Sequence, residues 1–490
     1  MVLALAATAC VGVSDDLDTD EPGQVVPTED ADPDAPTSLA RPDIVTEPCP
    51  ADLDDQADRC GFLIVPEDRG DPSGPVIEMA FIRLEGRQAA GQLPRPSPLV
   101  VLPDGPGQSG LAEAGQWLDS HLRDERDIIL IDPRGVGRSF PSLDCGEPPN
   151  PGALPLDLVE DCRANLVAQG IGLQSYDSTA IAADVADLAR ALQLSRINVL
   201  GIGHGAKVAL LLLRDAPDLL RSVVLDSAIP PEVDLYDERP RHGQAALNRL
   251  LDECALQSGC LERFGDLGAD FAQTVVQLDR QPAEAGVGVM ISGTDLVLAA
   301  LAAMRGAVGP GTVPAALSSA IEGDPEEALA QLQQSAIAGA AVPTSGFSEG
   351  LRLSVDCREE VPFTRADPEG QAEGLGPVGR SVAGDVADVL RACNMWDVGQ
   401  AGDEVRQPVS GPVATLVLTG EFDPLSPPAW GAAAAAQLDD ATVVQVGGAG
   451  HRVHDVDDCT IELVAAFLDD PREEVDGTCA ADRVVRFDLS

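Results

Sequence analysis

RINVLGIGHGAKVALLLLRDAP, residues 196–217, joins an aliphatic run to a glycine-rich turn and then to a second aliphatic run. The first run is short and rich in β-branched residues, as buried strands of parallel sheets are. After the turn, Val208, Leu211 and Leu212 recur at helical spacing from about Gly205 onward. The segment therefore predicts a strand, a tight turn and a helix, the repeating unit of a parallel α/β sheet.

The same pattern continues on both sides of this unit. PLVVLPDG (98–105) and DIILIDPRG (127–135) each end an apolar strand in a glycine turn, and SVVLDSAIPP (222–231) supplies the strand after the helix. Ala- and Leu-rich helical stretches alternate with such runs from about Cys49 onward. We expect a mostly parallel central sheet with helices on both faces.

Composition limits the classes of partner. The 490 residues carry 81 acidic and 32 basic side chains, a formal net charge of −49, and 44% of them are apolar. That apolar fraction is enough for a large core and excludes a chain that is disordered throughout. A nucleic-acid partner needs clustered Lys and Arg, and no such run exists; Lys207 is the single lysine.

The first cysteine marks an N-terminal segment of its own. MVLALAATAC places small residues directly before Cys10 and resembles a bacterial lipoprotein signal with its lipid-attachment cysteine. The basic residues that open such a signal are missing. Residues 11–48 are acidic and contain several prolines, which predicts a disordered tether. We expect an exported protein of the bacterial cell envelope that meets the membrane through a lipid anchor alone.

The other ten cysteines form couples that are close in sequence. Their number is even and no C-x-x-C spacing occurs, which favours five disulfides in an oxidising compartment over a metal site. We expect neither a metal nor a cofactor, and sequence leaves the connectivity open. The couples are Cys49 and Cys60, Cys145 and Cys162, Cys254 and Cys260, Cys357 and Cys393, and Cys459 and Cys479.

Several motifs in order resemble one family, the prolyl and tripeptidyl aminopeptidase-like serine peptidases of the α/β-hydrolase fold. The resemblance covers about Cys49 to Cys479 and implies a core over 49–235, a helical cap over 236–400 that selects substrates by their free amino terminus, and a C-terminal core part over 401–490. The motifs are LPDGPGQSG (102–110), LIDPRGVGRSFPSLDC (130–145), YDSTAIAADVADLARAL (176–192), CALQSGCLERFGDL (254–267), VDC (355–357) with CNMW (393–396), and the segment 411–479.

The resemblance also assigns the catalytic positions, which such hydrolases order as Ser, Asp and His. Asp423, after the strand in TLVLTGEFDPLSPP, takes the position of the acid, and His451, in VVQVGGAGHRVHD, that of the base. The nucleophile position, in the centre of GIGHG, holds Gly203. The oxyanion donors would come from the loop with Gly105 and Gly107 and from the backbone N–H of His204.

A glycine offers no oxygen or sulfur nucleophile, so the family's acyl transfer loses its first step. Serine proteases that lack a triad member keep about 10³ to 10⁴ of rate over water, far below a working peptidase. Two serines are alternatives: Ser348, in the only literal G-x-S-x-G (GFSEG, 346–350), has no strand before it, and Ser109 belongs to the oxyanion loop. Water activated by His451 is a third.

For most of the remaining polar residues, we expect a structural or surface position and not a catalytic role. Asp104 stands where the family usually shows a glycine and either weakens anion binding or caps the turn. We expect Lys207 on the solvated side of its helix, the His204 side chain packed or exposed, and His454 at the surface, with support of the His451 loop as its alternative. His121 and His242 show no partner pattern.

We predict an α/β-hydrolase-fold monomer that binds a peptide or small molecule in a degenerate peptidase cleft. The first alternative is an active peptidase or esterase with another nucleophile. The second is a structural or adhesion role.

Overall fold

The computed structural model describes residues 42–50, 53, 57–87, 97–146, 155–285, 289–306, 309–339 and 346–489. Cys10 and residues 11–41 of the expected tether lie outside this range. Residues Arg41–Ser490 form one compact unit.

Nine strands form one sheet in the order β1-β2-β3-β5-β4-β6-β7-β10-β11. The pairs from β5 to β11 are parallel, whereas β1, β2 and β3 pair antiparallel with their neighbours. The mostly parallel sheet confirms the predicted fold class. The bounds are β1 Asp43–Glu47, β2 Ala57–Pro66, β3 Val76–Leu84, β4 Leu99–Leu102, β5 Ile128–Ile131, β6 Ile197–Ile202, β7 Leu220–Asp226, β10 Thr415–Gly420 and β11 Ala441–Val446.

The boundary of the expected tether is wrong at its C-terminal end. Asp43–Glu47 forms β1, an edge strand in register with β2, although most of its side chains are exposed. Backbone pairing and the Cys49–Cys60 disulfide hold this acidic strand. Its side chains contribute little apolar burial, so hydrophobic periodicity gives no signal there.

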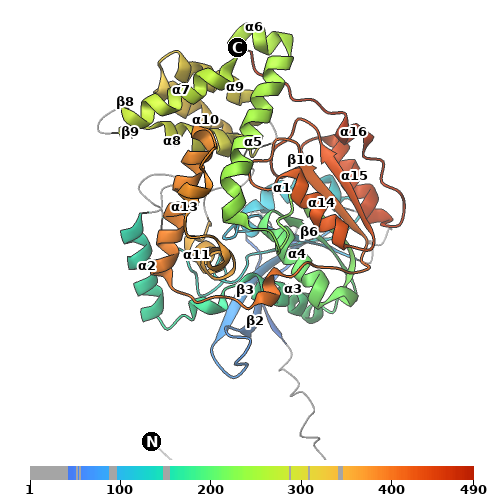
Figure 1. Cartoon of the computed structure of the whole chain (residues 1–490). Helices are drawn as coiled ribbons and strands as arrows, with labels where there is room; N and C mark the ends of the chain where they lie inside the picture. The colour runs from blue at the N-terminus through green and yellow to red at the C-terminus, as the bar shows by residue number, and fades with distance from the viewer. Residues whose placement is uncertain are drawn as a thin grey trace, which may run out of the picture. The chain divides into compact units, whose positions relative to one another are not determined.

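Helices cover both faces of the sheet (Figure 1). One face packs against α2, α3, α4 and α14, and the other against α1, α15 and α16. Because the central strands are buried on both faces, they read as continuous apolar runs. The bounds are α1 Ala114–Asp119, α2 Leu156–Ala168, α3 Ser178–Ala191, α4 His204–Asp215, α14 Pro428–Gln437, α15 Asp458–Asp469 and α16 Thr478–Ala481, with short 3-10 turns η1 Leu111–Glu113, η2 His121–Arg123, η3 Leu173–Ser175, η4 Pro217–Leu219 and η7 Asp403–Arg406.

The segment between β7 and β10 is mainly helical, as expected for a cap. Its first part, α5 to α10, builds a core of its own with the start of α13, whereas α11 and the end of α13 pack on the core that includes α3 and α4. The helices are α5 Leu235–Leu256, α6 Ser258–Phe264, α7 Leu267–Arg280, α8 Gly293–Ala303, α9 Gly309–Ile321, α10 Pro325–Gly339, α11 Glu349–Val355, α12 Pro368–Gln371 and α13 Pro377–Trp396, with the π-helical turn η5 Asp356–Glu360, the turn η6 Val361–Phe363 and a hairpin of β8 Ala283–Ala285 and β9 Val289–Ile291.

All five cysteine couples of the sequence analysis are disulfide-bonded, which confirms that prediction and settles the connectivity that the sequence left open. Five disulfides are consistent with an extracytoplasmic location. No helix among the described residues has the length and apolar character that a membrane crossing requires. The bonds join Cys49 to Cys60, Cys145 to Cys162, Cys254 to Cys260, Cys357 to Cys393, and Cys459 to Cys479.

Candidate active site

The turn from β6 to α4 has the geometry of a nucleophile elbow. Gly203 has φ +53° and ψ −111°, and its N–H donates to the carbonyl of Asp226 at 2.9 Å. A Cβ at Gly201 would lie 2.4 Å from the carbonyl oxygen of Gly205, and one at Gly205 would lie 2.3 Å from that of Leu102. The flanking glycines are therefore needed for close backbone approach, as in a strand-to-helix elbow, and residue 203 of this turn is itself a glycine.

Asp423 and His451 meet beside this turn. Nδ1 of His451 lies 2.8 Å from Oδ2 of Asp423, and both side chains are buried. Three further donors hold the carboxylate: the hydroxyl of Ser426 at 2.6 Å, and the N–H groups of Leu425 and Ser426 at 2.8 and 3.0 Å. The sequence analysis missed Ser426, whose hydroxyl also lies 3.1 Å from Nδ1 of His451.

Asp104 lies beside both Gly203 and His451. Its Oδ1 would lie 2.0 Å from a Cβ built on Gly203, and its Oδ2 lies 3.3 Å from Nε2 of His451. That Nε2 would lie 3.0 Å from the same Cβ. On its other side, Asp104 forms an ion pair with Arg305 of the cap at 3.1 Å. The carboxylate therefore takes the place, next to the base, where a serine side chain would begin.

Two carboxylates now flank one imidazole. Burial alone lowers the pKa of His451, but Asp423 and Asp104 outweigh it and raise that pKa to about 10. Burial raises the pKa of Asp104, whereas His451 and then Arg305 hold it well below its usual range. The raised pKa favours the protonated imidazolium between the two carboxylates, and the protonated form of a histidine is not available as a general base.

The expected oxyanion loop lies against this cluster. Gly105 and Gly107 have φ of +140° and +104°. A Cβ at Gly107 would lie 2.5 Å from the carbonyl oxygen of Ser348, whose N–H donates to Gly107 at 2.8 Å. The backbone of Gly105 also contributes to the lowered pKa of the adjacent Asp104 carboxylate.

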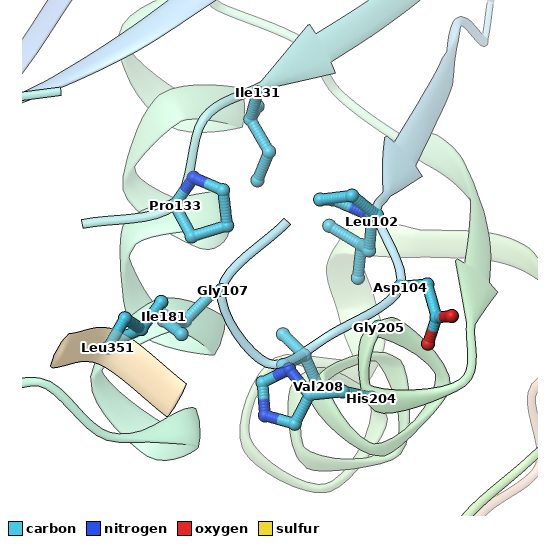
Figure 2. Close-up of a pocket in the computed structure, with 11 residues that line it drawn as sticks. Leu102, Asp104, Gly107, Ile131, Pro133, Ile181, His204, Gly205, Val208 and Leu351 are labelled. Carbon is cyan, nitrogen blue, oxygen red and sulfur yellow. The ribbon is translucent and has the colours of Figure 1, made fainter. Parts of the chain in front are cut away.

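A cavity behind the loop is very small. It has a volume of about 10 Å³, room for about one water, and Figure 2 shows the Asp104 carboxylate directed away from its Ile131 and Pro133 walls. His204 and Gly205 of the elbow border it as well.

Both alternative serines have structural roles. The Ser109 hydroxyl donates to Asp132 at 2.5 Å and accepts from the N–H of Ala112 at 3.0 Å. The Ser348 hydroxyl accepts from the N–H of Leu351 at 3.2 Å and caps α11. Both side chains are buried, and neither contacts His451 in a hydrogen bond that the structure shows.

Two polar side chains differ from their expected environment. Lys207 is buried, not solvated, because α4 lies under the cap, where Glu359 and Glu360 pair with its ammonium. His454 is buried, not on the surface, with Nδ1 2.7 Å from Asp226. The alternative was right, because the Val453 and His454 N–H groups also donate to Asp226 and fix the His451 loop.

The other histidines are placed as follows. The side chain of His204 is packed, with Nε2 2.9 Å from the hydroxyl of Ser178, and burial lowers its pKa to about 4. His121 is exposed beside Asp124. His242 does have a partner, since its Nε2 lies 2.8 Å from Glu238, four residues earlier on α5.

Among the described residues, no group of three or more His, Cys, Asp or Glu side chains could hold a metal ion.

Comparisons with known proteins agree with this architecture. Residues 98–255 match the model of the alpha/beta hydrolase fold, and residues 380–479 match the model of TAP-like protein. The serine protease Hip1 of Mycobacterium tuberculosis is 26% identical, over 84% of this chain and 84% of the relative. The putative hydrolase YuaR of Escherichia coli is 24% identical, over 86% and 87%. The tripeptidyl aminopeptidase of Streptomyces coelicolor is 28% identical, over 41% and 40%. The chain is thus an α/β-hydrolase with a TAP-like C-terminal part, related to Hip1 and to the tripeptidyl aminopeptidases.

Proposed function

We propose that this chain is a catalytically impaired relative of the serine peptidases, which acts by binding a ligand. The observation that carries the proposal is the contact of Asp104 with His451 at 3.3 Å beside a glycine elbow. Acyl transfer needs a nucleophile and a neutral imidazole, and the site has neither at neutral pH.

The relatives are named as a protease and as aminopeptidases, which supports a peptide as the ligand class, with a small molecule as the alternative. A ligand in the peptidase cleft that the family resemblance implies cannot extend to Gly203. The Asp104 carboxylate lies at that position and forms an ion pair with Arg305. Recognition therefore falls to cap and loop residues that lie outside the Asp104 and His451 contact.

The proposal is tested by turnover of p-nitrophenyl esters and of aminoacyl and tripeptidyl p-nitroanilides, together with fluorophosphonate labelling. Four forms are compared: native, Gly203→Ser, Asp104→Gly and the double variant Asp104→Gly/Gly203→Ser. We expect turnover and labelling in the double variant alone, because a serine needs both a hydroxyl and the space that Asp104 occupies.

The matched blank is His451→Ala in the native and double-variant backgrounds. If the native protein already turns over a substrate and loses that activity with His451→Ala, the impaired-enzyme proposal is wrong. The active-hydrolase alternative, with His451-activated water or another nucleophile, then takes its place.

The location is a separate proposal. We propose that Cys10 carries a lipid anchor and that the disulfide-bonded body faces an oxidising compartment. Metabolic labelling of the full-length chain with an alkyne fatty acid is expected to mark the native protein and not Cys10→Ser. Equal labelling of the two forms, or none of either, contradicts the anchor.

A further inference from the structure

The ammonium of Lys207 is enclosed at the boundary between core and cap. Lys207 lies one turn into α4 and is 2% exposed. Its Nζ lies 2.8 Å from Oε2 of Glu359 and 2.5 Å from Oε1 of Glu360. Two consecutive acids of the cap thus share one cation of the core.

The carboxylate of Glu359 is held by the core as well. Its Oε1 accepts from the N–H of Ser178 at 2.6 Å, and its Oε2 accepts from the Ser178 hydroxyl at 2.7 Å. Ser178 begins α3, so one carboxylate connects α3 and α4 to the π-helical turn η5. A second cap residue, Arg358, pairs with Asp177 at 3.2 Å, directly before Ser178.

The charges at this boundary depend on the lysine. Burial raises the pKa of Glu359, but Lys207 outweighs it and lowers that pKa below its usual value. Lys207 is the single cation within salt-bridge distance of either glutamate in the part of the chain that the structure describes. Its removal leaves two buried carboxylates without a counter-charge, which is far more destabilising than loss of an exposed pair.

We propose that Glu359 and Glu360 form a binding site for a primary ammonium group, and that Lys207 fills this site from within and so holds the Asp356–Glu360 turn of the cap on α3 and α4. The site suits a compact –NH₃⁺ group, since three N–H donors serve two carboxylates at close range. A small primary alkylammonium ion can therefore replace the lysine side chain once that side chain is shortened. The proposal does not depend on whether the chain is an enzyme.

The test is rescue of Lys207→Ala by propylammonium. We expect the variant to unfold at a lower temperature than the native protein and the amides of residues 351–363 to exchange hydrogen at least about tenfold faster. Propylammonium is expected to restore both readouts in a saturable way. Sodium and tetramethylammonium at equal ionic strength are expected to restore neither, because they donate no N–H.

Three controls separate a site from a general effect. Glu369→Gln, on the exposed side of α12, removes a cap acid outside the site and is expected to leave the exchange of residues 351–363 unchanged. Lys207→Ala/Glu359→Gln is expected to lose the rescue by propylammonium. The native protein is expected to show no response to propylammonium beyond that to sodium.

Unchanged exchange in Lys207→Ala, or equal rescue by tetramethylammonium, overturns the proposal. If Lys207→Ala does not fold, Glu360→Gln keeps it testable, because this variant halves the charge that faces the lysine. Faster amide hydrogen exchange of η5 in Glu360→Gln, with the other helices of the cap unaffected, supports the proposal that Lys207 holds this turn. Exchange equal to that of the native protein contradicts it.

Discussion

At the scale of single residues, Gly203 and Asp104 act as a pair. Glycine at the elbow leaves the space in which the Asp104 carboxylate lies, and that carboxylate reaches within 3.3 Å of Nε2 of His451 and raises the pKa of that imidazole. Sequence reasoning identified both positions but treated them separately, because they lie far apart along the chain and only the fold shows that they touch. Asp423 and His451 were placed through the family resemblance, whereas Ser426 carries no sequence signal beyond its nearness to Asp423.

The first prediction concerns Gly203→Ser by itself. A Cβ at this position would lie 2.0 Å from Asp104, and φ of +53° is strained for any residue with a side chain. We expect the single variant to lose about 1–3 kcal/mol of unfolding free energy. Asp104→Gly/Gly203→Ser is expected to lose less than the sum of its single variants, as coupled neighbours do. Denaturant unfolding of the four forms measures this, and simple additivity contradicts the pairing.

The second prediction is a pH dependence. The folded-state pKa of His451 is raised from 6.5 to about 10, so its contribution to stability is complete below pH 6.5 and is lost as the pH rises toward 10. The pKa of Asp104 is lowered, so its contribution is lost as the pH falls below the usual range of an aspartate. The difference in unfolding free energy between the native protein and His451→Gln is therefore expected to shrink between pH 6.5 and 10. A constant difference across that window contradicts the charged cluster.

At the scale of elements, apolar runs in the sequence predicted the strands and helices that are held by burial of apolar side chains. The unit of β6, turn and α4, the strands around it and the helical cap follow from periodicity and glycine placement. Three features did not: β1, whose stability comes from backbone pairing, and the buried side chains of Lys207 and His454, whose surroundings come from distant segments. A helix shows from its own sequence which face is apolar, but not that a cap will bury its polar face.

The third prediction concerns the disulfide that joins the two cap elements nearest the core. Cys357 on η5 and Cys393 on α13 close a loop of sequence separation 36. Replacing both cysteines by alanine is expected to cost about 3–4 kcal/mol of unfolding free energy, since the unfolded chain gains loop entropy. The same double replacement of Cys254 and Cys260, with a separation of 6, serves as the short-loop comparison and is expected to cost less. Equal losses contradict the argument from loop length.

At the scale of the whole molecule, we expect the net charge to decide how the stability of the protein depends on salt concentration. A formal charge of −49 makes the compact state repel itself, and added salt screens that repulsion. The family and its fold were predictable because several motifs occur in order along the chain. The position of Asp104 between Gly203, His451 and Arg305 was not predictable, because it depends on contacts among the oxyanion loop, the elbow, the cap and the His451 loop.

The fourth prediction follows from that charge. We expect the thermal unfolding midpoint to rise as KCl increases from about 0.02 M to about 1 M, because the Debye length falls from over about 20 Å to about 3 Å. A neutral osmolyte at matched osmolarity is the control for surface exclusion. A midpoint that falls steadily with KCl shows that exposed ion pairs, not net repulsion, dominate.

The central claim, that Asp104 at a glycine elbow has replaced the nucleophile, is tested most directly by fluorophosphonate labelling of Asp104→Gly/Gly203→Ser beside the native protein. The account predicts a label on the introduced serine of the double variant, lost when His451→Ala is added, and no label on any serine of the native chain. A labelled native protein, or a folded double variant that stays unlabelled, contradicts it.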